Sequence, residues 1–215
     1  MIVAIDGPAG TGKSVLARMI SENLGFYLLN TGLFYRALTY QILQDCPDSP
    51  LSCPNICEIA EKSVYEVENS TFLANGQDVY PFLRTSVVDE YVSQISAIPE
   101  VRNILNEKMR SLNKDNLVCE GRDTTTVVFP HAELKIYLDA SIEVRALRRF
   151  NERCSNLSLE KIKQTITERD KRDKEKPVGA LKIAKDALYI DSSDLTLKEV
   201  CERVEAKIRN RLLGS

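Results

Sequence analysis

Short, almost continuously apolar runs recur along the chain, and between them apolar residues return every three or four positions. Such runs are typical of strands in a parallel sheet that is covered on both faces. They predict five strands, at Ile2–Ile5, Tyr27–Leu29, Leu117–Cys119, Leu134–Leu138 and Ala187–Ile190. Strands that alternate with helices predict an α/β fold of three layers with right-handed crossovers.

Two of the predicted helices carry clear end signals. Residues 14–24 place apolar side chains on one face, and Gly25 follows as a C-terminal stop. Thr196 and Glu199 have the spacing of a capping box, which predicts the start of a final helix.

The alternation of strands and helices is interrupted between residues 45 and 90. This segment begins with a stretch rich in proline, serine and cysteine. Three short extended runs follow, at Val64–Glu68, Thr71–Ala74 and Gln77–Val79. The pair Asn75-Gly76 is typical of a tight turn between strands. We therefore predict a small β-containing insert at 45–90, carried by a core domain formed from 1–44 and 91–215.

Composition and charge narrow the class of protein. The 215 residues are 43% hydrophobic and 28% charged, which is usual for a folded globular chain. The 29 basic and 31 acidic residues give a net charge of −2, whereas nucleic-acid binders usually have a basic excess. No apolar run approaches the roughly 20 residues that span a bilayer, and the first residues do not resemble a signal peptide. We expect a cytoplasmic monomer with no nucleic-acid polymer and no membrane as partner.

The six cysteines and the single histidine do not suggest a metal site. No Cys-x-x-Cys pair occurs, and His131 is distant in sequence from the nearest cysteines. Structural zinc sites usually show tighter paired spacings. We expect reduced thiols and no catalytic role for His131.

The strongest motif follows the first predicted strand and opens the first predicted helix. It fits G-x-x-x-x-G-K-[ST] with the residues Gly7, Pro8, Ala9, Gly10, Thr11, Gly12, Lys13 and Ser14. The backbone amides of such a loop and the positive end of its helix bind phosphate oxygens. Lys13 is expected to reach the β- and γ-phosphates, and the Ser14 hydroxyl is expected to bind Mg²⁺. The chain lacks the Asn/Thr-Lys-x-Asp segment with which GTPases read their base.

Further candidates follow the second and third predicted strands. Thr31 and Arg36 come after the second strand, and Arg122 and Asp123 come after the third. Ligands of open α/β sheets bind beyond the carboxyl ends of the strands. Two arginines there can bind a second phosphate bidentately.

The segment 169–176 is charged at every position. It reads either as a solvated helix end or as a mobile lid that brings Arg169 and Arg172 over a polyphosphate and excludes water.

Several segments resemble the bacterial cytidylate kinases, the CMP/dCMP kinases of the P-loop nucleoside monophosphate kinase superfamily. The specific ones are Thr31-Gly32-Leu33-Phe34-Tyr35-Arg36, Gly121-Arg122-Asp123 and Glu168-Arg169-Asp170-Lys171-Arg172-Asp173. The resemblance implies a three-layer P-loop kinase fold with a five-stranded parallel sheet, a nucleoside monophosphate (NMP)-binding insert and a short helical lid at about 155–180. It also implies Mg²⁺-dependent transfer of the ATP γ-phosphoryl group to CMP or dCMP.

The same resemblance assigns roles to single residues. Ser93, Arg102 and Asp123 would read the cytosine, and Thr31, Arg36 and Arg122 would hold the monophosphate. Arg169 and Asp173 would contact the sugar and the lid side, and Arg172 would face the transferred phosphoryl group. Lys13, Arg169 and Arg172 are the expected catalytic residues.

Some positions depart from the family pattern, and two other functions stay open. Glu120, the pair Thr124-Thr125 and Lys176 stand where relatives carry other residues, and Lys176 lacks the bidentate fork of an arginine. A P-loop kinase for another acceptor, such as UMP, dTMP, shikimate or dephospho-coenzyme A, is one alternative. A non-catalytic nucleotide-sensing module is the other.

Overall fold

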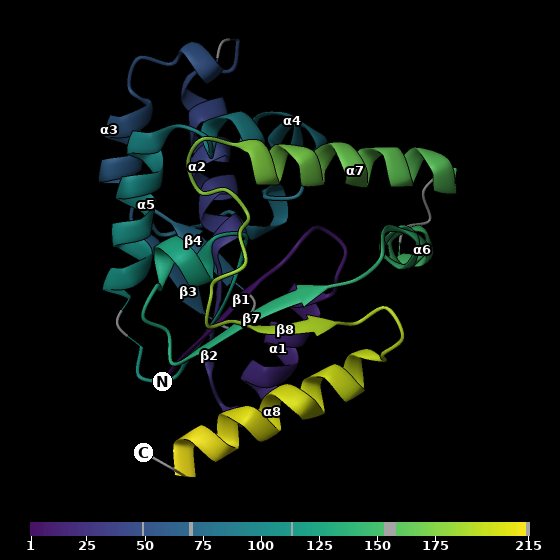
Figure 1. Ribbon diagram of the computed structural model, residues 1–215. Helices are drawn as coiled ribbons and strands as arrows, with labels where there is room; N and C mark the ends of the chain where they lie inside the picture. Colours follow the sequence, from purple (N-terminus) through teal and green to yellow (C-terminus); the bar gives the residue numbers. More distant parts are fainter. Residues whose placement is uncertain (49, 69–70, 113, 153–157, 214–215) are drawn as a thin grey trace. The chain divides into compact units, whose positions relative to one another are not determined.

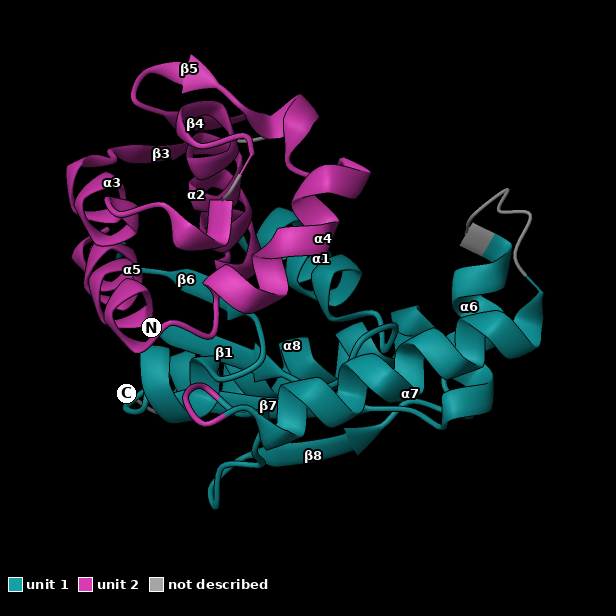
Figure 2. Cartoon of the chain, turned by 90° about the horizontal axis from the view of Figure 1, so that it is seen from above, with its two compact units in different colours: residues 1–29, 114–176, 180–215 teal, residues 30–113, 177–179 magenta. Residues whose placement is uncertain are grey.

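The computed structural model describes residues 1–48, 50–68, 71–112, 114–152 and 158–213 (Figure 1). The chain divides into two compact units (Figure 2). Unit 1 comprises residues 1–29, 114–176 and 180–215, and unit 2 comprises residues 30–113 and 177–179. Unit 1 is thus assembled from three separate stretches of sequence.

A five-stranded sheet forms the centre of unit 1. Its strands are β1 (Ile2–Asp6), β2 (Tyr27–Asn30), β6 (Leu117–Glu120), β7 (Leu134–Asp139) and β8 (Leu188–Asp191), in the order β2-β6-β1-β7-β8. β1 runs parallel to β6 and β7, with Ile2 opposite Leu117 and Val3 opposite Leu134, and β8 runs parallel to β7. The predicted α/β fold with a five-stranded parallel sheet is confirmed, although β8 begins one residue later than expected.

The helices of unit 1 cover this sheet. They are α1 (Lys13–Leu24), α6 (Ile142–Glu152), α7 (Leu159–Glu175) and α8 (Leu197–Leu213). Apolar residues of α1 and α8 pack against β1, β6 and β7 in one core, and Figure 1 shows α7 on the opposite side of the sheet from α8. Among the described residues, none of the helices has the length and apolar character needed to cross a membrane.

Both predicted end signals of these helices are confirmed. Gly25 ends α1 in the left-handed region at φ 69°, where a side chain is unfavourable. At the start of α8, Thr196 N donates to Glu199 Oε2 at 2.8 Å, and Glu199 N donates to Thr196 Oγ1 at 3.3 Å. These reciprocal bonds are those of a capping box.

Unit 2 combines helices with a small sheet. Its elements are α2 (Thr31–Asp45), η1 (Pro50–Ser52), α3 (Ile56–Lys62), β3 (Tyr65–Glu68), β4 (Thr71–Ala74), β5 (Gln77–Asp78), η2 (Tyr80–Phe82), α4 (Ser86–Ile95) and α5 (Pro99–Ser111). The strands are antiparallel in the order β3-β4-β5, and the rings of Phe34, Tyr65 and Phe72 pack edge to face or tilted in its core.

The short strands expected in the insert are present in unit 2. Asn75 and Gly76 form the predicted turn, with φ angles of 53° and 77°, whereas residues 69–70, between the first two predicted runs, lie outside the described residues. The compact unit is larger than the insert predicted at 45–90, because α2, the end of α4 and α5 pack together with it.

Candidate functional site

The phosphate loop connects β1 to α1 in the strand–loop–helix order that its motif requires. Gly7 has φ 151°, and a Cβ atom there would lie 2.0 Å from the carbonyl oxygen of Leu138. Gly12 has φ 93° and immediately precedes the first residue of α1. The loop therefore passes so close to β7 that its first position accepts only glycine.

Lys13 is folded back onto this loop. Its side chain is buried, and Nζ donates to the carbonyl oxygen of Pro8 at 2.6 Å and to Thr11 Oγ1 at 3.3 Å. Burial, followed by the positive charge of Arg122, lowers the pKa of Lys13 from 10.5 to about 7. The ammonium group is thus held where its charge is unfavourable until an anion arrives.

Ser14 and Glu120 form an oxygen pair beside the loop. Ser14 Oγ donates to Glu120 Oε1 at 2.8 Å, and Glu120 is 4% exposed at the end of β6. A hydroxyl and a carboxylate are hard oxygen ligands of the kind that Mg²⁺ prefers. The described residues contain no group of three or more His, Cys, Asp or Glu side chains that could hold a metal ion. Two protein oxygens, completed by phosphate and water, are nevertheless the usual protein share of a nucleotide-bound Mg²⁺.

Arg122 lies in the same unit and is paired with a carboxylate of α7. Its Nε donates to Asp173 Oδ2 at 2.8 Å, and Lys176 Nζ lies 3.4 Å from Asp173 Oδ1. Burial opposes the charge on Arg122, but the carboxylates of Asp173 and Glu120 outweigh it and raise the pKa of Arg122. Burial likewise opposes the charge on Asp173, but Arg122 and Lys176 lower the pKa of that carboxyl. Arg122 therefore stays a cation close to the ammonium of Lys13.

The charged segment 169–176 is more than a solvated helix end. Asp170 is 8% exposed, and its Oδ2 accepts from Arg145 NH1 at 2.5 Å, while the same nitrogen donates to the carbonyl oxygen of Ala9 at 3.2 Å. Arg172, in contrast, is exposed, and its Nε donates to the carbonyl oxygen of Glu168 in its own helix at 3.4 Å. One side of this segment is therefore tied to unit 1, and the expected catalytic residue Arg172 lies on the other side.

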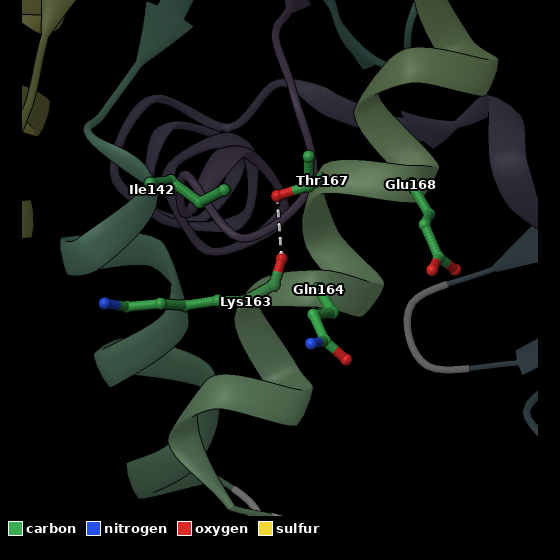
Figure 3. A pocket seen from close by; sticks show the side chains of 5 residues that line it. All are labelled: Ile142, Lys163, Gln164, Thr167 and Glu168. Carbon is green, nitrogen blue, oxygen red and sulfur yellow. Dashed lines mark hydrogen bonds between the residues drawn. The ribbon is translucent and has the colours of Figure 1, made fainter.

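A shallow pocket lies between α6 and α7 (Figure 3). Its volume is about 410 Å³, and it is lined by Ile142, Lys163, Gln164, Thr167 and Glu168. Figure 3 shows the Thr167 hydroxyl donating to the carbonyl oxygen of Lys163, at 2.9 Å, instead of pointing to a ligand. Because neither the phosphate loop nor an arginine lines this pocket, it is not the candidate site.

In unit 2 the expected phosphate-binding residues come from α2. Thr31 is buried at the first position of the helix. Arg36 donates to the carbonyl oxygen of Leu83 at 2.7 Å and to Asp89 Oδ1 at 2.6 Å. Like Arg122 in unit 1, Arg36 therefore has a carboxylate partner within its own unit.

Two of the expected base-reading residues lie in unit 2, on α4 and α5, and both form a hydrogen bond with Ser96 between these helices. Arg102 is 2% exposed, its NH1 donates to the carbonyl oxygen of Ser96 at 2.9 Å, and its guanidinium lies 5.2 Å from the ring centre of Tyr35. Ser93 is exposed on α4, and its carbonyl oxygen accepts from Ser96 Oγ at 3.0 Å. The structure thus brings Ser93 and Arg102 to one corner of unit 2.

The expected site residues divide between the two units. Residues 7–14, Arg122, Asp123, Arg169, Arg172 and Asp173 belong to unit 1, and Thr31, Arg36, Ser93 and Arg102 belong to unit 2. Sequence reasoning gave Glu120 no role and did not single out Arg145. The position of Glu120 at the carboxyl end of a predicted strand could have indicated a site residue. Arg145 is one of several arginines on α6, and nothing in the sequence distinguishes it from the others.

Comparison with known proteins gives one consistent family. The profile of the family described as cytidylate kinase matches residues 3–210. The cytidylate kinase of Borrelia turicatae is 42% identical over 206 residues, covering 94% of this chain and 93% of the relative. The cytidylate kinase of Borreliella burgdorferi is 40% identical over 214 residues, covering 96% of each chain.

Solved structures agree on the fold. The shikimate kinase of Bacteroides thetaiotaomicron superposes with a TM-score of 0.52 at 12% identity, covering 97% of this chain and 98% of that one. At this identity the likeness concerns the fold and carries no statement about the substrate.

Proposed function

The chain belongs to the cytidylate kinase family, and from this premise we propose that it transfers the γ-phosphoryl group of ATP to CMP or dCMP, giving ADP and CDP or dCDP. The observation that carries the proposal is the cluster of groups in unit 1. There a buried ammonium on the phosphate loop, Lys13, lies close enough to Arg122 for the two charges to interact. The loop suits the donor phosphates, and Arg122 suits the phosphate of the acceptor.

Positioning and charge neutralisation account for the chemistry. The acceptor is already a phosphate oxyanion, so no side chain has to remove a proton from it. We propose that Lys13 neutralises the β- and γ-phosphates and that Ser14 and Glu120 hold Mg²⁺, which supplies further neutralisation when bound. Arg169 and Arg172 of α7 are proposed to contact the sugar side and the transferred phosphoryl group.

We propose a role in recognition of the acceptor for seven residues. Thr31, Arg36 and Arg122 are each proposed to contact the monophosphate. Ser93, Arg102 and Asp123 would read the cytosine, because a carboxylate such as Asp123 accepts from the exocyclic amine that uracil lacks. Asp173, on α7, would contact the sugar.

An acceptor panel tests this function. ADP release is measured with ATP, Mg²⁺ and one of CMP, dCMP, UMP, dTMP, shikimate or dephospho-coenzyme A. We expect CMP and dCMP to give kcat/KM values at least about tenfold above the others, since a site built to hydrogen-bond a substrate group strongly rejects an analogue that lacks it. A higher value for UMP contradicts the roles given to Ser93, Arg102 and Asp123. ATP binding without ADP release on any acceptor would indicate a sensing module.

The lowered pKa of Lys13 predicts how ATP affinity changes with pH. Bound phosphates favour the charged ammonium and raise this pKa. Above pH 7, Lys13 therefore has to take up a proton when ATP binds. We expect the affinity for ATP to fall by up to about tenfold between pH 8 and pH 9, where phosphate monoesters, with a second pKa of about 6, are already ionised. Calorimetry in buffers of different ionisation enthalpy measures the proton uptake directly.

The Lys13→Met variant is the control for this pH dependence. It has no ammonium to titrate, so its residual affinity is expected to stay constant between pH 8 and pH 9. A pH-independent affinity in the unmodified chain would contradict the assignment.

We further propose that the chain acts in the cytoplasm and as a monomer. Its described cysteines, Cys46, Cys53, Cys57, Cys119 and Cys201, are free thiols, the state that a reducing compartment maintains. All proposed ligands of ATP and CMP come from one chain.

A further inference from the structure

A buried carboxylate, Asp6, lies at the end of β1 and is not used in the chemistry described above. It is fully buried, and each of its oxygens accepts two hydrogen bonds. Oδ1 accepts from Thr124 N at 2.8 Å and from Thr124 Oγ1 at 2.7 Å. Oδ2 accepts from Thr125 N at 2.7 Å and from Thr125 Oγ1 at 2.6 Å. A carboxylate with this set of donors is held in one orientation.

The partners of this carboxylate lie next to functional residues on both sides. Asp6 directly precedes Gly7, the first residue of the phosphate loop, and Thr124 directly follows Asp123. The turn η3 (Thr124–Val128) is itself well fixed, because the amides of residues 126–128 donate to the carbonyl oxygen of Asp123. Asp6 therefore joins the start of the phosphate loop to the Arg122-Asp123 pair within one unit.

We propose that Asp6 is a positioning residue that fixes Arg122 and Asp123 relative to the phosphate loop. This inference rests on the proposed function, in which the loop holds the donor and Arg122 and Asp123 hold the acceptor. Phosphoryl transfer depends on alignment, and a displacement of about 1 Å can lower its rate a hundredfold. We call the four hydrogen bonds to Asp6 the Asp6 clamp. The hydroxyls of Thr124 and Thr125 donate two of these four bonds, so they contribute to the positioning.

The turn also provides a matched control. Thr126 is the next residue, and its Oγ1 is buried without a hydrogen-bond partner among the described residues. A Thr126→Val change removes the same hydroxyl as Thr124→Val or Thr125→Val, but it removes no bond to Asp6. Any difference between these variants therefore reports on the clamp and not on the loss of a buried hydroxyl.

The experiment compares the unmodified chain with Thr124→Val/Thr125→Val, Thr126→Val and Asp6→Asn. The double variant keeps the two amide bonds to Asp6, and Asp6→Asn places an amide nitrogen against one pair of donors. We expect kcat with CMP to fall about tenfold in the double variant, with the Kd for ATP within twofold of the unmodified chain. In Asp6→Asn, which also removes a negative charge that raises the pKa of Lys13, we expect kcat to fall about a hundredfold and ATP to bind more weakly. The preference for CMP over UMP should fall with kcat, and Thr126→Val should match the unmodified chain.

A merely structural role would give a different pattern. Thermal unfolding measures the stability of each variant, and kcat is determined well below the lowest midpoint. If the double variant and Asp6→Asn unfold earlier but keep their kcat and CMP preference, the proposal is overturned. It is also overturned if Thr126→Val lowers kcat as much as the double variant. If the unmodified chain itself does not phosphorylate CMP, the proposed function fails first, which separates the two conclusions.

Discussion

Replacing Lys13 by methionine is expected to lower kcat by about a thousandfold and to leave the stability of the fold unchanged or higher. Lys13 is proposed to neutralise the negative charge that develops on the transferred group, and removing a single such donor commonly lowers kcat by 10²–10³. The stability follows from its lowered pKa, since the folded state disfavours the buried ammonium that the unfolded chain carries freely below pH 10. Methionine has a similar length and no charge to bury.

The measurement is kcat with saturating ATP and CMP, together with thermal unfolding of both proteins. Lys171→Met on the exposed side of α7 is the control, because it removes an equal charge without touching the loop. Turnover of Lys13→Met within tenfold of the unmodified chain would contradict the role given to Lys13.

The second large effect is expected at Arg122. Arg122→Met should lower kcat/KM for CMP by at least about a hundredfold, because one charge-assisted hydrogen bond contributes roughly 1.5–3 kcal/mol and a guanidinium forms two with a phosphate. The Kd for ATP should change far less. Asp173 keeps Lys176 as a partner, at 3.4 Å, so the fold should tolerate the loss.

Two further arginine variants sharpen this experiment. Arg122→Lys keeps the charge but loses the bidentate fork, so its kcat/KM for CMP should fall between those of the unmodified chain and Arg122→Met. Arg18→Met removes an exposed arginine from α1 and should have no effect. A kcat/KM for CMP of Arg122→Met within threefold of that of the unmodified chain would contradict the proposed role of Arg122 in binding the acceptor.

The sheet and the phosphate loop were predictable because their signals are local. Each strand is a short apolar run, and the loop has glycines where the backbone of the structure accepts no other residue, as at Gly7. The small strands of unit 2 were found for the same reason, since Asn75-Gly76 marks their turn. The size of unit 2 was not predictable, because it depends on how α2, α4 and α5 pack and not on any change of composition along the chain.

The contacts of the site residues were much harder to foresee. A helix segment that is charged at every position looks the same in sequence whether it is solvated or paired, so nothing indicated that Asp170 and Asp173 bind Arg145 and Arg122. Glu120 was left without a role for a related reason. Its importance depends on the 2.8 Å contact with Ser14, a residue more than a hundred positions earlier.

The division of the chain has a consequence for how it folds during synthesis. β1 is synthesised well before the strands it pairs with, because its register places residue 2 opposite residue 117 and residue 3 opposite residue 134. The central strand therefore has to remain unpaired until most of the chain has been made, and such long-range parallel pairing is intrinsically slow. Residues 30–113, which form nearly all of unit 2, are contiguous and emerge in between. The apolar run Ile2–Ile5 is thus a segment prone to aggregation in the nascent chain, and we expect the yield of folded protein to depend on its protection until β6 and β7 have been made.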